Sequence, residues 1–175
     1  GGVIAFDTGP GNALIDEWMQ EREGKNLDDG GRTAARGRPD EQLLAWLLTH
    51  PFFFRRPPKS LDRNWFSHKL AGQLSTEDGA ATLTAFTAGS VGKGLDLLPK
   101  RPTRIIVCGG GRKNPTMMRE MAKRTGCEIL LAEDVGLRGD AVEAECFAFL
   151  AIRSMRQMPY SYPLTTGVKA PQTGG

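Results

Sequence analysis

The sequence predicts an α/β domain in which helices flank a mixed sheet, and three observations lead to that prediction. Short apolar runs typical of buried strands alternate with segments whose apolar residues recur at helical spacing. The strand-like runs end in turn residues, and the connections between elements are short. A length of 175 residues fits one domain, so we expect residues 1–175 to fold as a single unit.

Three apolar runs are expected to form the strands of the sheet. Residues 3–6 (VIAF) end in the turn DTGPGN, and residues 104–108 (RIIVC) end in three consecutive glycines. Residues 128–132 (EILLA) make up the third run. Runs of this length, bounded by turn residues, are typical of buried strands, and we expect the first two to be buried.

Five segments are expected to be helical, because apolar residues recur in them three or four positions apart. They are residues 13–22, 41–49, 79–98, 115–125 and 141–155. Asp40 and Asp140 stand directly before the second and the last helix, where a carboxylate can cap the first backbone N–H groups. Ser75 begins the approach to the third helix in the same way. The methionines of the fourth helix are expected to face the core.

Two connecting segments are long enough to have a character of their own. Residues 23–38 are polar and rich in glycine, which indicates a surface loop. Residues 51–59 contain three prolines, and proline interrupts a helix, so we expect an extended segment held in place by its phenylalanines.

Composition and charge exclude several classes of protein. With 23 basic and 20 acidic residues the net charge is +3, too balanced for a protein that binds nucleic acid. No apolar run reaches the ~18 residues that a membrane span needs, so we expect a cytoplasmic protein without membrane contact. Cys108, Cys127 and Cys146 form no CxxC pair, and a metal site is not expected with 2 histidines. We expect these cysteines to be reduced and buried.

The turn DTGPGN follows the first expected strand and carries candidate functional residues. Glycine has no Cβ, so Gly9 and Gly11 would let the backbone N–H groups of the turn approach an anion closely. Asp7 stands where the strand ends, where a carboxylate can accept a proton from an attacking hydroxyl or water, or hold Mg²⁺. The alternative is a tight turn closed by a hydrogen bond to the Asp7 side chain.

A second glycine-rich turn, CGGGRKNP, connects the second expected strand to the fourth helix. Gly109, Gly110 and Gly111 leave room for a flat ring or a ribose to pack against the backbone. Asn114 can cap the helix that follows, and the N-terminus of that helix favours negative charge. The alternative is a strand–helix turn with no ligand, because the sequence matches neither GxGxxG nor the P-loop pattern.

Four strings occur in the order in which one known family has them. They are FDTGPGN (residues 6–12), PPKS (57–60), VCGGG (107–111) followed by Asn114 and Pro115, and DAVEA (140–144). The series closely resembles the C-terminal half of the anhydro-N-acetylmuramic acid kinases, members of the actin-like ATPase and sugar kinase superfamily. The resemblance covers residues 3–167.

The resemblance implies a fold and a reaction. The fold would be an actin-like ATPase (ribonuclease H-like) lobe, the C-terminal nucleotide-binding lobe of a two-lobe kinase whose N-terminal lobe is absent. With ATP and Mg²⁺, the family hydrolyses the 1,6-anhydro bond of anhydro-N-acetylmuramic acid and phosphorylates O6. The product is N-acetylmuramic acid 6-phosphate, an intermediate of peptidoglycan recycling. Without its N-terminal lobe the chain would be inactive, because only one side of the nucleotide is held.

The resemblance also implies roles for individual residues. Asp7 would be the general base, and Glu143 would contact the sugar, although an acid in the first turn of a helix is also favoured by the helix dipole alone. The remaining candidates are expected to bind the phosphates (Thr8, Gly9, Gly11 and Asn12) and the adenosine (Gly109, Gly110, Gly111 and Asn114). Lys59 and Arg63 would either contact phosphate or fix the aromatic segment.

Two other functions stay open from the sequence. One is an actin-fold kinase that acts on a different sugar, and the other is a non-catalytic module that binds nucleotides. Apolar residues at 52–54 and 65–66 indicate a possible homodimer contact, and they could equally pack within this domain.

Overall fold

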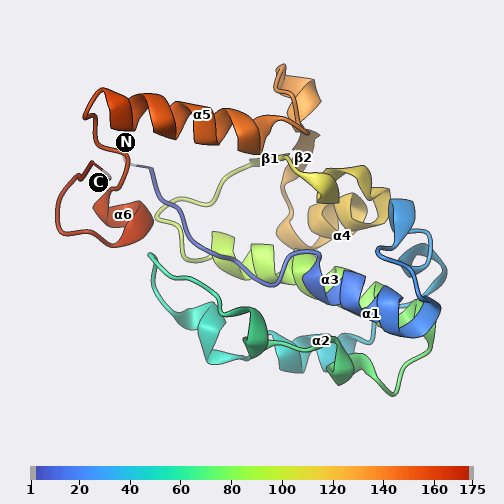
Figure 1. Ribbon diagram of the computed structural model, residues 1–175. Helices are drawn as coiled ribbons and strands as arrows, with labels where there is room; N and C mark the ends of the chain where they lie inside the picture. Colours follow the sequence, from blue (N-terminus) through green and yellow to red (C-terminus); the bar gives the residue numbers. More distant parts are fainter. Residues whose placement is uncertain (1–2, 174–175) are drawn as a thin grey trace.

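The computed structural model describes residues 3–173, in which helices surround a small parallel sheet (Figure 1). The elements are α1 (Ala13–Glu23), α2 (Glu41–Leu47), α3 (Thr76–Leu95), β1 (Arg104–Val107), α4 (Pro115–Thr125), β2 (Glu128–Leu131), α5 (Val142–Met155) and α6 (Pro163–Thr166). Short 3-10 turns lie between several of them. The five helices expected from the sequence are confirmed, whereas the expected mixed sheet is wrong: the described strands form one parallel pair.

The sheet is built from β1, α4 and β2 in sequence, with Arg104 opposite Glu128 and Val107 opposite Leu131. Burial alternates along β1, and Ile106 is 50% exposed. The expectation that this strand is buried is therefore wrong. Alternate side chains of a strand point to opposite faces, and the face that carries Ile105 packs against the core while the other stays open.

Residues 3–6 do not form the first strand of the sheet, which corrects the sequence-based expectation. Their backbone makes isolated hydrogen bonds instead of a ladder: the Ala5 N–H donates to the carbonyl of Leu164 (3.1 Å), and the Asp7 N–H donates to that of Lys59 (3.0 Å). A strand requires a continuous neighbouring edge. Here the two bonds go to segments far apart in the sequence.

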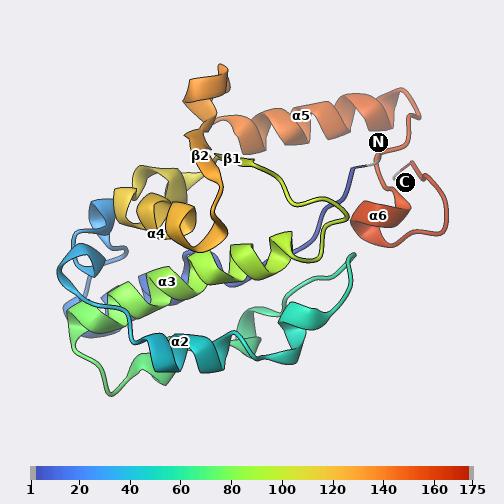
Figure 2. The same ribbon diagram turned by 180° about the vertical axis from the view of Figure 1, so that it is seen from behind.

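The core lies around α3, which lies between α2 and α4 (Figures 1 and 2). Residues of α3 are buried on almost every side. Helices α1, α2 and α4 pack on it, and α4 makes the most extensive contact. Glycine on α3 permits close approach: a Cβ on Gly79 would lie 2.5 Å from Cε2 of Trp18. The Trp18 side chain is fully buried, and its indole N–H donates to the Thr76 carbonyl (2.9 Å).

The segment 51–59 is only partly extended. Pro51–Phe54 forms a 3-10 turn, because proline is tolerated in a first helical turn and the His50 ring accepts the Phe52 N–H (3.2 Å). Phe52 and Phe53 are buried, as expected, and contact other aromatic rings of the core. Residues 23–38 are likewise more than a surface loop, since they contain two 3-10 turns and several buried side chains.

Of the caps expected at Asp40, Ser75 and Asp140, the first two are confirmed. The Asp40 carboxylate accepts the N–H groups of residues 42 and 43, and the Ser75 hydroxyl accepts that of Asp78. Asp140 does not cap the last helix, because its carboxylate pairs with Arg112 and Lys113 instead. Of the described helices, none is long and apolar enough to cross a lipid bilayer.

Helix α5 lies on the opposite side of the sheet from α3 and α4 (Figure 1). None of its residues is buried, and Phe147 and Phe149 are 66% and 57% exposed. All three cysteines are free. Cys127 is buried as expected, but Cys108 and Cys146 are exposed, because one follows the half-open strand β1 and the other lies on α5.

Candidate functional site

The turn DTGPGN lies against the side of α3. The Thr87 hydroxyl of α3 donates a hydrogen bond to the carbonyl of Gly11 (2.7 Å). A Cβ on Gly9 would lie 2.7 Å from Oγ of Ser90, closer than side-chain atoms pack. Thr8 in turn contacts α3 where Gly94 leaves space. Gly9 therefore has a packing role that the sequence alone did not indicate: it lets the turn touch the helix.

Asp7 is exposed, and both its backbone and its side chain are held by the segment that follows the aromatic turn. Its N–H donates to the Lys59 carbonyl (3.0 Å), and its Oδ2 accepts the N–H of Leu61 (2.8 Å). Among the described residues, the Asp7 side chain accepts no hydrogen bond from within the turn DTGPGN. The carboxylate is thus oriented by a distant segment.

The second glycine-rich turn is shaped by its backbone and by Asn114. Gly109 has φ 75°, a conformation that glycine adopts without strain. The Asn114 side chain accepts the Met117 N–H (2.9 Å), which confirms the expected cap of α4. Gly110 has nothing within 4 Å of the position that a Cβ would occupy.

The two turns meet, and two adjoining cavities lie where they do. A Cβ on Gly111 would lie 3.3 Å from Oδ1 of Asn12. A cavity of about 330 Å³ is lined by Thr8, Gly9, Gly11, Asn12, Cys108 and Gly111, among others. A cavity of about 410 Å³ is lined by Asn12, Gly110, Gly111 and Asn114, among others. The structure therefore brings together seven of the ten residues proposed from the sequence.

The other three candidates, Asp7, Gly109 and Glu143, line neither cavity. Asp7 and Gly109 are chain neighbours of lining residues. Glu143 is exposed in the first turn of α5, with no contact to either turn that the structure records.

Carboxylates of α1 and of the following loop also line the larger cavity, and they were not among the residues predicted from the sequence. Asp28 is 5% exposed, and its two oxygens accept the N–H groups of Thr33 (2.8 Å) and Ala34 (2.9 Å). Burial, with the nearby charge of Glu17, raises the pKa of Asp16. The dipeptide Asp28-Asp29 before two glycines was the available signal.

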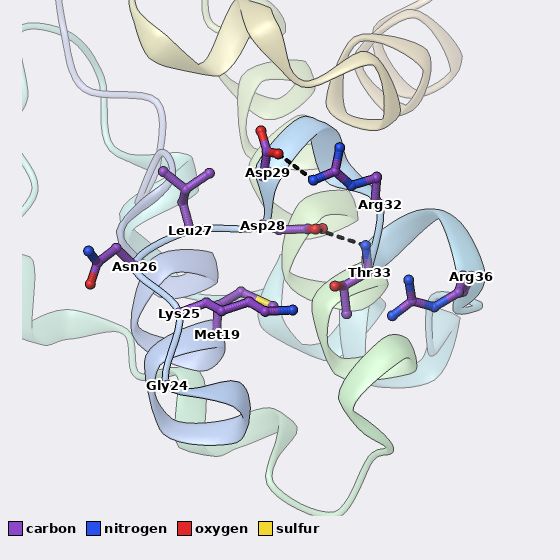
Figure 3. A pocket seen from close by; sticks show the side chains of 10 residues that line it. All are labelled: Met19, Gly24, Lys25, Asn26, Leu27, Asp28, Asp29, Arg32, Thr33 and Arg36. Carbon is purple, nitrogen blue, oxygen red and sulfur yellow. Dashed lines mark hydrogen bonds and ion pairs between the residues drawn. The ribbon is translucent and has the colours of Figure 1, made fainter.

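The same loop has a third cavity, of about 470 Å³, on its other side (Figure 3). Leu27, Asp28 and Asp29 line this cavity as well as the larger one of the site, so the loop forms a wall between the two. Figure 3 shows Asp28 directed to the Thr33 backbone and Asp29 paired with Arg32. The basic side chains around this third cavity have acidic partners.

Arg112 fixes the second turn and was not among the predicted site residues. Its buried guanidinium donates to the Gly109 carbonyl (2.9 Å), to Asp140 (2.8 Å) and to Glu133 (2.7 Å). A Cβ on Gly139 would lie 2.5 Å from Cζ of this guanidinium, so glycine is needed there. The hydrogen bond from Arg112 lowers the pKa of Glu133. Hydrogen bonds from Arg112, the larger cause, and from Lys113 lower the pKa of Asp140.

Lys59 lies at the aromatic segment and lines neither cavity. Its ammonium donates to the Phe52 carbonyl (2.9 Å) and lies over the Phe52 ring. Of the two alternatives from the sequence, this contact favours fixing the aromatic segment. The Arg63 side chain falls outside the described part of the structure. Within that part, no group of three or more His, Cys, Asp or Glu side chains is arranged to hold a metal ion.

Two glycine-rich turns that meet beside the N-termini of two helices give the class of the protein, an α/β domain whose turns adjoin at helix starts. The sequence profile of the anhydro-N-acetylmuramic acid kinase family matches residues 1–175. The chain belongs to this family.

Curated relatives show the same likeness. The anhydro-N-acetylmuramic acid kinase of Methylobacterium nodulans is 57% identical over 175 residues, which are 100% of this chain and 47% of the relative. The protein of that name from Methylorubrum extorquens is 56% identical over 100% of this chain and 46% of the relative. The protein of that name from Brucella anthropi is 54% identical over 99% of this chain and 47% of the relative. The chain spans about half the length of the curated relatives it matches.

Proposed function

We propose that this chain is the C-terminal, nucleotide-binding lobe of a two-lobe kinase with the actin-like ATPase (ribonuclease H-like) fold. Family membership and the half-length match to kinases support this proposal. The contact between Asn12 and Gly111 carries it. One turn must hold the phosphates and the other the nucleoside of a single ATP molecule, so the two turns have to adjoin.

The smaller cavity suits the phosphates of ATP. Four of its lining residues, Thr8, Gly9, Gly11 and Asn12, belong to the first turn. Helix α1 begins directly after that turn, and the unpaired N–H groups at a helix N-terminus favour bound negative charge.

The larger cavity suits the adenosine. Its volume of about 410 Å³ lies in the range of small-molecule sites, about 300–1,000 Å³. Gly110 and Gly111 offer bare backbone to a flat ring. The carboxylate of Asp29 is exposed and can accept a hydrogen bond from a ribose hydroxyl, whereas that of Asp28 is already occupied by two backbone N–H groups.

In the complete enzyme, Asp7 accepts a proton from the water that attacks the anomeric carbon of anhydro-N-acetylmuramic acid. The bond between C1 and O6 breaks, and O6 attacks the γ-phosphorus of ATP. ADP leaves, and N-acetylmuramic acid 6-phosphate is the product. Mg²⁺ bound with ATP would supply charge neutralisation at the phosphates. Since the described residues offer no cluster of three or more metal ligands, the ion would be held mainly by phosphate oxygens and water.

The proposal has three further parts. Glu143 contacts the sugar, for which its exposed position on α5 leaves it accessible. Phe54 and Trp65, 62% and 42% exposed, are available for a homodimer contact. The reaction takes place in the cytoplasm, where ATP is available.

The test is ATP-dependent conversion of anhydro-N-acetylmuramic acid by the complete two-lobe enzyme and by its Asp7→Asn variant. We expect phosphorylated product from the unmodified enzyme and a loss of at least ~100-fold in kcat for the variant, since positioned bases contribute about 10²–10⁴-fold. Asp96→Asn is the matched control, because Asp96 pairs with Arg101 at the surface away from both turns. Equal loss in the two variants would contradict the assignment of Asp7.

The same assay separates the two alternatives. Turnover of ATP with other sugars but not with this one would leave a kinase of different specificity. Binding of ATP with no transfer to any sugar in a panel would indicate a non-catalytic nucleotide-binding module.

A further inference from the structure

Lys59 is a buried cation without an opposite charge. Lys59 is 7% exposed, and no carboxylate within residues 3–173 makes an ion pair with its ammonium. The ammonium donates to the Phe52 carbonyl (2.9 Å) and lies 4.1 Å from the centre of the Phe52 ring and 5.8 Å from that of Phe6. The groups around the Lys59 ammonium are thus one carbonyl oxygen and two aromatic rings.

This environment makes Lys59 costly for the stability of the fold. Burial, with the nearby charge of Arg55, lowers the pKa of Lys59, because the charged form has lost its water. An apolar side chain of similar volume avoids this desolvation cost. The Phe52 carbonyl would not be left unpaired, because it also accepts the Arg55 N–H (3.3 Å). Stability therefore does not explain a lysine here.

The position of Lys59 relative to Asp7 suggests what the lysine does. The Lys59 carbonyl accepts the Asp7 N–H, and two residues later the Leu61 N–H donates to Oδ2 of Asp7. Phe6, one of the two rings near the ammonium, directly precedes Asp7. Asp7 is therefore held through its N–H, its carboxylate and its preceding side chain by the segment 59–61.

We propose that Lys59 is a positioning residue for Asp7: its ammonium fixes the segment 59–61 to the buried Phe52, and that segment orients the Asp7 carboxylate. This inference rests on the proposed function, in which Asp7 is the general base. Oδ2 is occupied by the Leu61 N–H, and Oδ1 accepts no hydrogen bond within the described part of the chain. Oδ1 is therefore the oxygen that receives the proton of the attacking water.

The first experiment compares Lys59→Met with the unmodified two-lobe enzyme. We expect kcat to fall by about 10- to 100-fold with little change in the two KM values, because a misplaced catalytic group costs rate and not ground-state binding. Thermal stability should stay the same or rise. A lysine that served only the fold would give the opposite result, with lower stability and unchanged kcat.

Two further variants make the comparison specific. Lys59→Arg retains a positive donor and should retain most of the turnover. Lys93→Met is the matched control, because the Lys93 ammonium also lies near a phenylalanine ring, that of Phe54 (5.5 Å), but makes no recorded contact with Asp7. Equal turnover of Lys59→Met and Lys93→Met would overturn the proposal, and so would an equal loss in Lys59→Met and Lys59→Arg.

A second readout on the 175-residue chain does not depend on kinase activity. Hydrogen exchange of the Asp7 and Leu61 amides should become at least about tenfold faster in Lys59→Met, while amides of α3 keep their protection. If the intact enzyme phosphorylated no sugar, the proposed function would fall, and this exchange result would still decide whether Lys59 holds Asp7. Unchanged exchange at both amides would refute the positioning role.

Discussion

Replacing Gly9 by alanine would put a methyl group where the first glycine-rich turn touches α3. The new Cβ would lie 2.7 Å from Oγ of Ser90 and closer still to its Cβ, inside the 3.4 Å at which ordinary contact begins, so the turn must move by about 1 Å. Ser90 is fully buried and its hydroxyl is bonded to the Phe86 carbonyl, so the helix is the less movable partner. Overpacking of this kind costs about 1–3 kcal/mol of unfolding free energy.

The displaced turn should also bind ATP less well. A hydrogen bond to a charged group contributes about 1.5–3 kcal/mol, so losing one between the turn and a phosphate lowers affinity by about 10- to 150-fold. Titration calorimetry of the two-lobe enzyme with ATP measures this loss, and urea unfolding of the chain measures stability. In the double variant Gly9→Ala/Ser90→Gly the clash is absent, and most of the lost affinity should return.

A control separates lost affinity from lost stability. Gly126→Ala forces alanine into a conformation with φ 69° in open space, which lowers stability by about 1–2 kcal/mol and leaves ATP affinity unchanged. Two results would refute the reasoning. One is unchanged ATP affinity in Gly9→Ala, and the other is a double variant that binds no better than the single one.

Two other predictions concern charged side chains. Arg112→Met removes the bonds to the Gly109 carbonyl and to Asp140, so ATP affinity should fall by about tenfold, whereas Arg124→Met, which breaks a pair with Glu41, should leave it unchanged by calorimetry. The lowered pKa of Lys59 means that the unfolded chain binds more protons between that pKa and 10.5. The unfolding free energy should therefore rise with pH across this window, and urea unfolding of Lys59→Met should show a smaller rise.

Elements that depend on local signals were predictable from the sequence, and those that depend on distant partners were not. The helical spacing of Leu14 and Trp18 and the cap at Asp40 concern neighbours within a few positions, and the structure confirms them. Residues 3–6 have the composition of a strand, but a strand exists only where another edge accepts its hydrogen bonds. Asp140 meets the local rule for a cap, yet the positive charge of Arg112, 28 positions away, binds its carboxylate.

The candidate site follows the same division. Glycine-rich turns at expected strand ends indicated both walls of the site, and the structure places the two walls in contact. The roles of Asp28 and Arg112 depend on which groups the folded chain brings beside them, and no local sequence pattern encodes that. The turn DTGPGN also indicated an anion site without revealing that Gly9 is required by the Ser90 side chain.

Four of the five glycines in the two turns have a structural reason to be glycine, and Gly110 has none within the described chain. Gly11 and Gly109 have positive φ, while Gly9 and Gly111 lie against Ser90 and Asn12. Gly110 has neither a positive φ nor any atom within 4 Å of a Cβ.

Neither the backbone conformation nor the packing of the described chain therefore explains glycine at position 110, and we predict that the close approach of a ligand requires it. Gly110→Ala should raise the unfolding free energy by about 0.4–1 kcal/mol, because alanine restricts the unfolded chain, while ATP affinity falls. Urea unfolding and calorimetry measure the two effects separately. Unchanged ATP affinity would place the adenosine elsewhere, since a methyl group in the larger cavity at this position has only the ligand to meet.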